Sequence, residues 1–354
     1  MITDVIRRSG IAAKIRSMEG NLITYDGYYT LAHSGSLYDF AKKLMQYETY
    51  SEIIDESHAK YATRLSLERS LTKSMYRDYS HVYDFIADIN DRKYLDSLFL
   101  KYEIGIIKTL LRRLFDKRRI DNVVPSYDKY ISRHMKIDVN RLIHSKNFEE
   151  FLYNLSNTKF HKVLSKIEID KNPSLFSIET QLDIFCFQET WDYQYKYLSG
   201  TDVPSIERVN GVDIDLHNIM HVYRLKTYYE IDKSLIYSFL IPINYKIKKD
   251  VLIALINSQQ ESEFFNIINK TYYRNVFKRF GKADMKRDYY LFMYKIHNEE
   301  EKKYPYSMAK VTSYLYKKSL EIRNITTLVE CVMYGFNPDE TIAKLSVEPK
   351  KAAV

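Results

Sequence analysis

The sequence predicts an almost entirely α-helical protein. Leu, Lys, Glu and Arg recur at three- and four-residue spacing through most of the 354 residues, which is the period of amphipathic helices. Strict alternation of apolar and polar residues over the length of a strand is rare. Only 9 Gly and 7 Pro are available for turns and bulges. The 45% apolar composition can fill a large core, and the length suits two or three domains.

Three segments far apart in the chain carry the same helix-start pattern. Each has a capping residue and an acid in the first helical turn. The cap and acid pairs are Ser36 with Asp39, Asn147 with Glu150, and Ser258 with Glu261. Each then continues into a Phe-x-x-x-Leu/Ile pair, whose rings at Phe40, Phe151 and Phe264 are separated by 111 and 113 residues. This near-constant interval predicts three repeated units with these rings at equivalent buried places.

A second repeated feature is an acid followed by an aliphatic residue. Its acids, Glu103, Asp215 and Glu321, are separated by 112 and 106 residues. Asn218 and Asn324 follow the second and third acids at the same offset. A catalytic constellation would not normally recur three times at similar intervals. We therefore interpret these residues as structural. Their side chains bond exposed backbone groups at a neighbouring helix end and so fix, or seat, their own helices. Replacing Glu321 and Asn324 by Ala should then lower stability.

The repeat interval of about 110 residues is the size of a small domain. The sequence therefore predicts three helical lobes, residues 1–122, 123–232 and 233–354. Their boundaries are expected near "RRIDNVVPSYD" (119–128) and "YYEIDKS" (228–234). Residues 174–198 have the pattern of one long helix, and residues 57–90 have that of another if it is continuous. "NGVDID" at 210–215 lacks the ligands of a calcium loop and is expected to cap a following helix.

The segment "YLYKKSLEIRNITTLVECVMYGFNPDETIAKL" (314–345) predicts a long helix that stops and restarts. Gly335 suits the left-handed position after a helix end. Asn337 suits an N-cap, with Pro338 at the first helical position. Arg323 lies between Glu321 and Asn324 on the longer helix and belongs to the same candidate group.

The chain is basic, with 54 Lys and Arg against 46 Asp and Glu, a net charge of +8. Such a balance suits an acidic partner, an anionic membrane face or nucleic acid. The basic runs at 111–119, 245–250 and 277–288 have two interpretations. They could bind phosphates beside aromatic side chains, or they could be solvated helix ends, which their dispersion and flanking acids favour.

The sequence has no signal-peptide core at "MITDVIRRSG", and its most apolar run, residues 235–243, is too short to span a bilayer. We expect a soluble, cytoplasmic protein. Cys186 and Cys331 lie in apolar helical stretches and are expected to be buried free thiols in a reducing compartment.

Motifs for catalysis, cofactors and metals were not found. The chain lacks a phosphate-binding Gly-rich loop, a dinucleotide loop and a zinc-protease helix. His217 and His221 are one helical turn apart, but no third ligand lies at metal-site spacing, so we expect them on a helix surface. The sequence therefore predicts no catalytic residue, no cofactor and no metal.

Three segments resemble the C-type subunits (AC39-type, eukaryotic d-type) of V-type and archaeal-type rotary ATPases. The closing segment "YLYKKSLEIRNITTLVECVMYGFNPDETI" (314–342) resembles the closing helix of that family. "VDIDLHNIMHVYRLK" (212–226) is similar to its middle motif through Asp215, Asn218 and Arg224. "GIAAKIRSMEGNLI" (10–23) resembles its first helix. "LIPINYKI" (240–247) departs from the family by lacking a Gly pair after the Pro.

The resemblance implies a non-catalytic adaptor made of three similar helical lobes around a pseudo-threefold axis, shaped like a funnel. One end would rest on the membrane rotor ring and the hollow would receive the central shaft, so the protein would be peripheral to the membrane. The alternative, favoured by the basic charge and the 33 tyrosines, is a helical nucleic-acid-binding protein.

Overall fold

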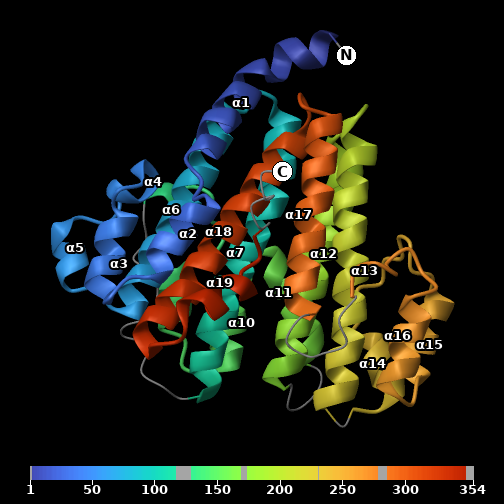
Figure 1. The fold of residues 1–354 in the computed structure, drawn as a ribbon. Coiled ribbons are helices and arrows are strands. Elements are labelled where there is room, and N and C mark those ends of the chain that lie inside the picture. Colours follow the sequence, from blue (N-terminus) through green and yellow to red (C-terminus); the bar gives the residue numbers. More distant parts are fainter. Residues whose placement is uncertain (1, 117–128, 169–173, 230, 278–284, 348–354) are drawn as a thin grey trace. The chain divides into compact units, whose positions relative to one another are not determined.

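The computed structural model describes residues 2–116, 129–168, 174–229, 231–277 and 285–347 (Figure 1). Within these ranges every regular element is a helix and none is a strand, which confirms the all-α prediction. The chain forms two compact units, residues 1–87 with 276–354, and residues 88–275. None of the described helices is both long enough and apolar enough to cross a membrane. The three predicted lobes divide the chain differently and stay a prediction.

The first unit is formed by both ends of the chain. Its helices are α1 (Ile2–Gly20), α2 (Tyr25–Ala32), α3 (Leu37–Leu44), α4 (Glu48–Ser51), α5 (Glu56–Lys60), α6 (Arg64–Phe85), α17 (Met285–Lys303), α18 (Met308–Tyr334) and α19 (Pro338–Lys344). The long helix α18 packs against α1, α2, α3, α6, α17 and α19. It therefore joins the early and late parts of the sequence in one core.

The core of this unit fills the space between α18 and the short N-terminal helices. Ile325, Leu328 and Val329 of α18 are fully buried together with Phe40 and Tyr50. Ile325, Leu328 and Val329 repeat at helical spacing on one face of α18, as the sequence pattern predicts. Burial of such side chains stabilises the fold by about 1.5–3 kcal/mol each.

The second unit is continuous in the sequence. Its helices are α7 (Ile89–Asp116), α8 (Lys129–Ser132), α9 (Val139–Ile143), α10 (Phe148–Asn154), α11 (Lys159–Glu168), α12 (Leu175–Tyr197), α13 (Asp202–Tyr228), α14 (Lys233–Ser238), α15 (Lys249–Asn257) and α16 (Glu261–Ile268). Helix α12 lies along α7 and also packs against α11 and α13. The short helices α14, α15 and α16 lie beside α13, where α15 contacts it (Figure 1).

Helix starts at two of the three repeated segments use the same arrangement. Ser36 and Asn147 cap α3 and α10 with their side chains, which confirms two of the predicted caps. The third is wrong: Gln260, not Ser258, is the N-cap of α16. Ser258 instead ends α15, where its hydroxyl donates to the carbonyl of Leu255 at 2.8 Å. Phe40, Phe151 and Phe264 are all buried, with 0%, 1% and 2% exposure.

The end of α18 has the predicted geometry. Gly335 adopts the left-handed conformation with φ 66°, where a side chain would be strained. Asn337 then caps α19 by accepting the backbone N–H of Glu340 at 3.1 Å, and Pro338 occupies the first helical position. The predicted stop and restart is therefore confirmed.

Two sequence expectations about helix length are wrong. Residues 57–90 are not one helix, because Thr63 caps α6 and the Asp88 carboxylate accepts the N–H groups of Asn90 and Asp91 at the start of α7. "NGVDID" does not precede a helix but lies inside α13. Its Gly211 is required there, since a Cβ atom would lie 2.4 Å from the ring of Tyr245. The expected lobe boundary at 119–128 lies outside the described residues, as does residue 230 of the second boundary.

Candidate functional site

The three repeat-related acids lie in the protein interior and accept backbone N–H groups. Glu103, Asp215 and Glu321 are only 1%, 1% and 3% exposed. Each carboxylate reaches a segment far from it in sequence, 33 residues away for Glu103, 30–32 for Asp215 and 298 for Glu321. Because a buried carboxylate must be hydrogen-bonded to be tolerated, each acid fixes its helix to one particular stretch of chain.

Glu321 connects α18, near the end of the sequence, with the N-terminal part of the chain. Its Oε2 accepts the N–H of Ile23 at 2.6 Å, two residues before the start of α2. Its Oε1 accepts the hydroxyl of Tyr50 at 2.7 Å and the ammonium of Lys318 at 2.7 Å. Charge-assisted bonds of this kind are shorter and stronger than bonds between neutral groups.

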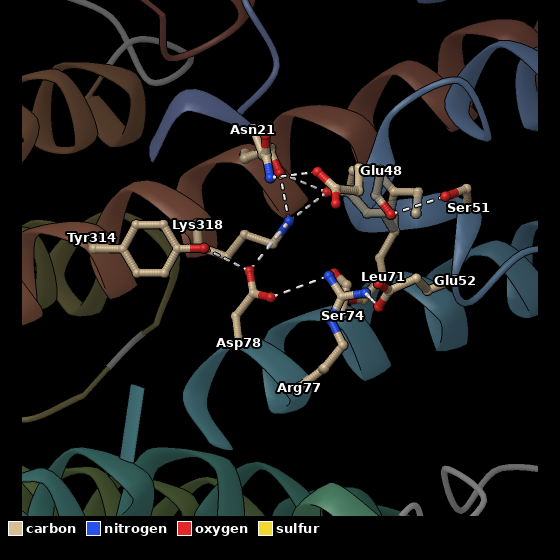
Figure 2. Close-up of polar contacts among 12 residues, drawn as sticks. Asn21, Glu48, Ser51, Glu52, Leu71, Ser74, Arg77, Asp78, Tyr314 and Lys318 are labelled. Atoms are coloured by element: carbon tan, nitrogen blue, oxygen red, sulfur yellow. Dashed lines mark hydrogen bonds and ion pairs between the residues drawn. The ribbon is translucent and has the colours of Figure 1, made fainter. Parts of the chain in front are cut away.

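Lys318 is the most unexpected member of this site, since its side chain is only 1% exposed. Its ammonium lies 3.0 Å from the Tyr50 hydroxyl and over that ring, and 3.8 Å from Oδ2 of Asp78 on α6. Figure 2 shows Asp78 between Lys318 and Tyr314 on one side and Arg77 on the other. Tyr314 donates to Asp78 Oδ2 at 2.7 Å, and Arg77 lies 3.3 Å from Oδ1.

This buried cluster of Glu321, Lys318, Asp78, Tyr50 and Tyr314 is called the α18 cluster below. Its lysine lies between two carboxylates, and the buried guanidinium of Arg77 beside Asp78 supplies the second positive charge that balances them. Burial and the nearby carboxylate of Glu321 raise the pKa of Tyr50 well above its usual value, so its hydroxyl stays a donor. Arg77 extends the network outward through an ion pair with Glu52 at 2.5 Å.

Asp215 on α13 has the same arrangement with different partners. Its Oδ2 accepts the N–H groups of Lys246 and Ile247 at 2.6 and 2.9 Å, and its Oδ1 accepts the N–H of Tyr245 at 3.2 Å. The hydroxyl of Tyr273 donates to Oδ2 at 2.8 Å. Tyr273 is fully buried, as the tyrosine beside Glu321 is. Burial raises the pKa of Asp215, and these four donors oppose that rise.

Glu103 on α7 lacks a tyrosine at the corresponding place. Its Oε1 accepts the N–H of Lys136. The residue that corresponds in spacing to Tyr50 and Tyr273 is Phe160, 110 residues after the first and 113 before the second. Burial raises the pKa of Glu103 to about 7, while the Lys136 ammonium lowers it and the Asp96 carboxylate raises it further.

The two repeat-related asparagines each bond both backbone groups of one residue. The side-chain amide of Asn218 donates to the carbonyl of Ile241 at 3.0 Å and accepts its N–H at 2.9 Å. Asn324 binds Ser346 in the same way, at 3.5 and 3.2 Å. A side-chain amide has both a donor and an acceptor, so it can satisfy the C=O and the N–H of one residue at once, which explains why Asn occupies both positions.

The two candidate arginines are more exposed than the acids. Arg323 donates to the hydroxyl of Tyr290 on α17 at 3.0 Å and stacks over that ring at 4.1 Å. Arg224 lies near the end of α13 and contacts the ring of His221, with 3.2 Å between the two nitrogens. The structure thus places each acid one helical turn from its asparagine, on α18 and on α13, while Arg224 lines a cavity that Asn218 also borders.

The expectation that both histidines of α13 lie on its surface is wrong for His221, which is buried, while His217 is half-buried. His221 is 8% exposed, and both His217 and His221 line a cavity between α12 and α13. Burial, with the Arg224 charge, lowers the pKa of each to about 4. Among the residues that the structure describes, no three metal-ligating side chains come together. Cys331 is a buried free thiol as expected, and Cys186 is half-buried.

The basic runs are partly outside the described residues, namely at 117–119 and 278–284. Of the rest, Arg112 forms a two-pronged ion pair with Glu179 at 2.6 and 2.8 Å. Lys246 and Lys249 lie over the rings of Tyr245 and Tyr237. These contacts engage the cations within the protein, and they give no support to the nucleic-acid interpretation.

The family model described as ATP synthase (C/AC39) subunit matches residues 11–344. The chain is similar to a protein of Pyrococcus furiosus named as the C subunit of A-type ATP synthase, with 25% identity over 92% of this chain and 87% of that protein. It is also similar to a protein of Methanosphaera stadtmanae with the same name, with 22% identity over 94% of this chain and 86% of that protein. The family match includes all three acids and both asparagines, and it agrees with the resemblance found in the sequence. The chain therefore belongs to the ATP synthase (C/AC39) subunit family.

Proposed function

We propose that this protein is a non-catalytic central-stalk adaptor of a rotary V/A-type ATPase. In this role it couples the rotating shaft to the membrane rotor ring, for ion transport or ATP synthesis. The observation that carries the proposal is membership of the ATP synthase (C/AC39) subunit family over residues 11–344. The proposed partners are the central-shaft subunits and the rotor-ring subunit, and no nucleic acid is expected. The adaptor would be cytoplasmic and peripheral to the membrane, which it contacts through the ring.

The proposed architecture is three lobes, residues 1–122, 123–232 and 233–354, around a pseudo-threefold axis. The bonds of the three acids support it. Glu103 of the first lobe bonds to the N–H of Lys136 in the second, and Asp215 of the second bonds to the N–H of Lys246 in the third. Glu321 of the third bonds back to the N–H of Ile23 in the first. If the chain is divided into these lobes, one acid links each lobe to the next and the third lobe to the first, as a cyclic arrangement requires.

The proposed role requires stiffness, because an adaptor between two rotating parts must transmit torque without yielding. The described residues supply it in two ways. Long helices such as α13 and α18, each of 27 residues, have continuously bonded backbones. The acids and asparagines then fix those helices to neighbouring chain by buried hydrogen bonds, which are costly to break. We propose that this seating is the role of Glu103, Asp215, Asn218, Glu321 and Asn324.

Association with the rotary enzyme is the direct test. The tagged chain, purified with its complex from membranes of cells that express it, should recover shaft and ring subunits. The variant Arg274→Gln is a suitable control, because Arg274 is exposed and lies outside the acid sites. It should recover the same subunits in the same ratio. Recovery of nuclease-sensitive nucleic acid without any rotary-ATPase subunit would instead support the alternative interpretation.

The purified chain alone should not hydrolyse ATP. The physical reason is that its sequence has no loop whose backbone N–H groups could cradle a triphosphate. The measurement is phosphate release at saturating MgATP, with the protein followed through two successive purification steps. Turnover that stays proportional to this chain through both steps would contradict the non-catalytic role.

A further inference from the structure

A cavity of about 470 Å³ lies in the second unit, between α12, α13 and the turn at residues 239–241. Its volume is within the range of small-molecule binding sites. Phe176 forms part of its wall, with its ring parallel to that of His221 at 2° and 6.2 Å, and edge-on to Phe239 at 5.3 Å. Ile184, Leu225 and Ile241 complete an apolar lining. Asn218, whose amide is bonded to Ile241, also belongs to the wall.

One face of α13 presents three nitrogen-bearing side chains to the cavity. His217, His221 and Arg224 are spaced at i, i+4 and i+7, which places them in a row on one side of the helix. Arg224 donates toward His221 Nδ1 at 3.2 Å, so the ring proton of neutral His221 is on Nε2. This Nε2 atom and His217 Nδ1 are buried and have no hydrogen-bond partner among the described residues.

The acids in the cavity wall do not neutralise Arg224, because other cations bind them. Glu179 is held by both prongs of Arg112. Asp183 lies 2.5 Å from the ammonium of Lys108. Both cations come from α7, the helix that lies along α12. The positive charge of Arg224 is therefore left without a counter-charge from this wall.

The corresponding positions of the other two repeats carry paired charges. The position of Arg224 corresponds to Arg112 and Glu330, 112 residues before it and 106 after it. Arg112 is paired with Glu179, and Glu330 is paired with Arg64 at 2.6 Å. In the second repeat, the only side-chain partner of Arg224 within the described part of the chain is the neutral ring of His221. The cavity therefore lies at the repeat position whose arginine has no acidic partner among the described residues.

We propose that this cavity binds a small organic anion with an apolar or aromatic body. Its phosphate or carboxylate group lies on Arg224, with the imidazole of His221 as a second donor. Its apolar body lies against Phe176 and Phe239. A guanidinium binds both kinds of anion through parallel N–H groups, and an arginine next to an aromatic wall recognises charge and ring together. The anion supplies the counter-charge that Glu179 supplies to the equivalent arginine of the first repeat.

The test is calorimetric titration of the full chain with phenyl phosphate, inorganic phosphate and benzyl alcohol. Phenyl phosphate should bind saturably at one site, and each of the other two probes at least about tenfold more weakly, since each lacks one half of the recognised chemistry. Phenyl phosphate should also move the imidazole NMR signals of His217 and His221. Equal affinity for benzyl alcohol, or no saturable binding of phenyl phosphate, would overturn the proposal.

Arg224→Gln should weaken phenyl phosphate binding by about tenfold or more, because it removes the cation while leaving a polar side chain of similar length. Arg224 is exposed, so the variant should fold, which circular dichroism can verify. Arg274→Gln is the matched control, with the same charge change outside the cavity, and it should bind as the unaltered protein does. An equal loss in both variants would mean that only net charge attracts the anion, and would overturn the site. The assay uses the isolated chain, so its outcome is independent of the adaptor function.

Discussion

Replacement of Glu321 by Ala is expected to lower the free energy of unfolding of the first unit by roughly 3–5 kcal/mol. The variant leaves the Lys318 ammonium of the α18 cluster buried beside Asp78 at 3.8 Å, without the carboxylate that now lies 2.7 Å from it. It also removes the acceptor for the N–H of Ile23 and for the Tyr50 hydroxyl. Thermal unfolding followed by circular dichroism should show Tm lowered by roughly 10 °C.

A matched pair of variants separates the contribution of the buried charge to the free energy of unfolding from that of the hydrogen bonds. Glu321→Gln keeps an amide that can accept one bond but leaves Lys318 without its counter-charge. Lys318→Met combined with Glu321→Gln removes both charges together. If the buried charge is the main cost, the double variant should be more stable than Glu321→Gln alone. Melting of Glu321→Ala at the Tm of the unaltered protein, combined with loss of shaft or ring binding, would make this residue an interface residue and not a seat.

Acidification from pH 8 to pH 5 is expected to increase the contribution of Glu103 to stability. The pKa of Glu103 is about 7 in the folded protein against 4.5 for the unperturbed group. Between these values the folded protein keeps the proton and the unfolded chain does not, so the free energy of unfolding falls as pH rises through this window. The difference of 2.5 pKa units corresponds to about 3 kcal/mol. Glu103→Gln, measured by urea unfolding at both pH values, should lack this dependence.

Phe160→Tyr should reduce the dependence of the free energy of unfolding on pH, if its new hydroxyl donates to Glu103 as the Tyr273 hydroxyl donates to Asp215. Phe160 packs edge-on against Phe185 of α12, the helix that lies along α7 and its Glu103. A hydroxyl donating to the carboxylate favours the ionised form, by about 1.5–3 kcal/mol for a bond to a charged group. The variant should therefore gain stability at pH 8 relative to pH 5.

Comparison of one variant at two pH values cancels the packing cost of the added oxygen, which is the same at both. Tyr273→Phe is the reciprocal control, because it removes the 2.8 Å hydroxyl bond to Asp215. It should lower stability, because the buried carboxylate of Asp215 loses one of its four donors. A change in Phe160→Tyr that is equal at both pH values would show that position 160 does not correspond to Tyr50 and Tyr273.

The parts of the fold that sequence could predict are those determined by neighbouring residues. Ser36, Asn147 and Asn337 cap helices because their own side chains reach a backbone N–H three residues on. The failure at Ser258 has a non-local cause. The ammonium of Lys226 on α13 donates to its carbonyl and its hydroxyl, at 2.6 and 2.7 Å, which holds Ser258 at the end of α15.

The candidate site was predictable to the extent that it repeats. The interval between the three buried acids identified them, although no single helix pattern distinguishes them. Lys318 was missed because lysine is almost always at the surface, and its partners Asp78 and Tyr50 are about 240 and 268 residues away in the chain. A local signal did exist, since Lys318 precedes Glu321 by one helical turn on an otherwise apolar face.

The bond between Glu321 and the N–H of Ile23 has a consequence for how the chain is made. The first unit needs residues from both ends, so it cannot be completed on the ribosome until α17 and α18 have emerged. The second unit, residues 88–275, is contiguous and is available earlier, since domains usually fold as units during synthesis. Until then the apolar faces of α2, α3 and α6 lack their partner helix α18.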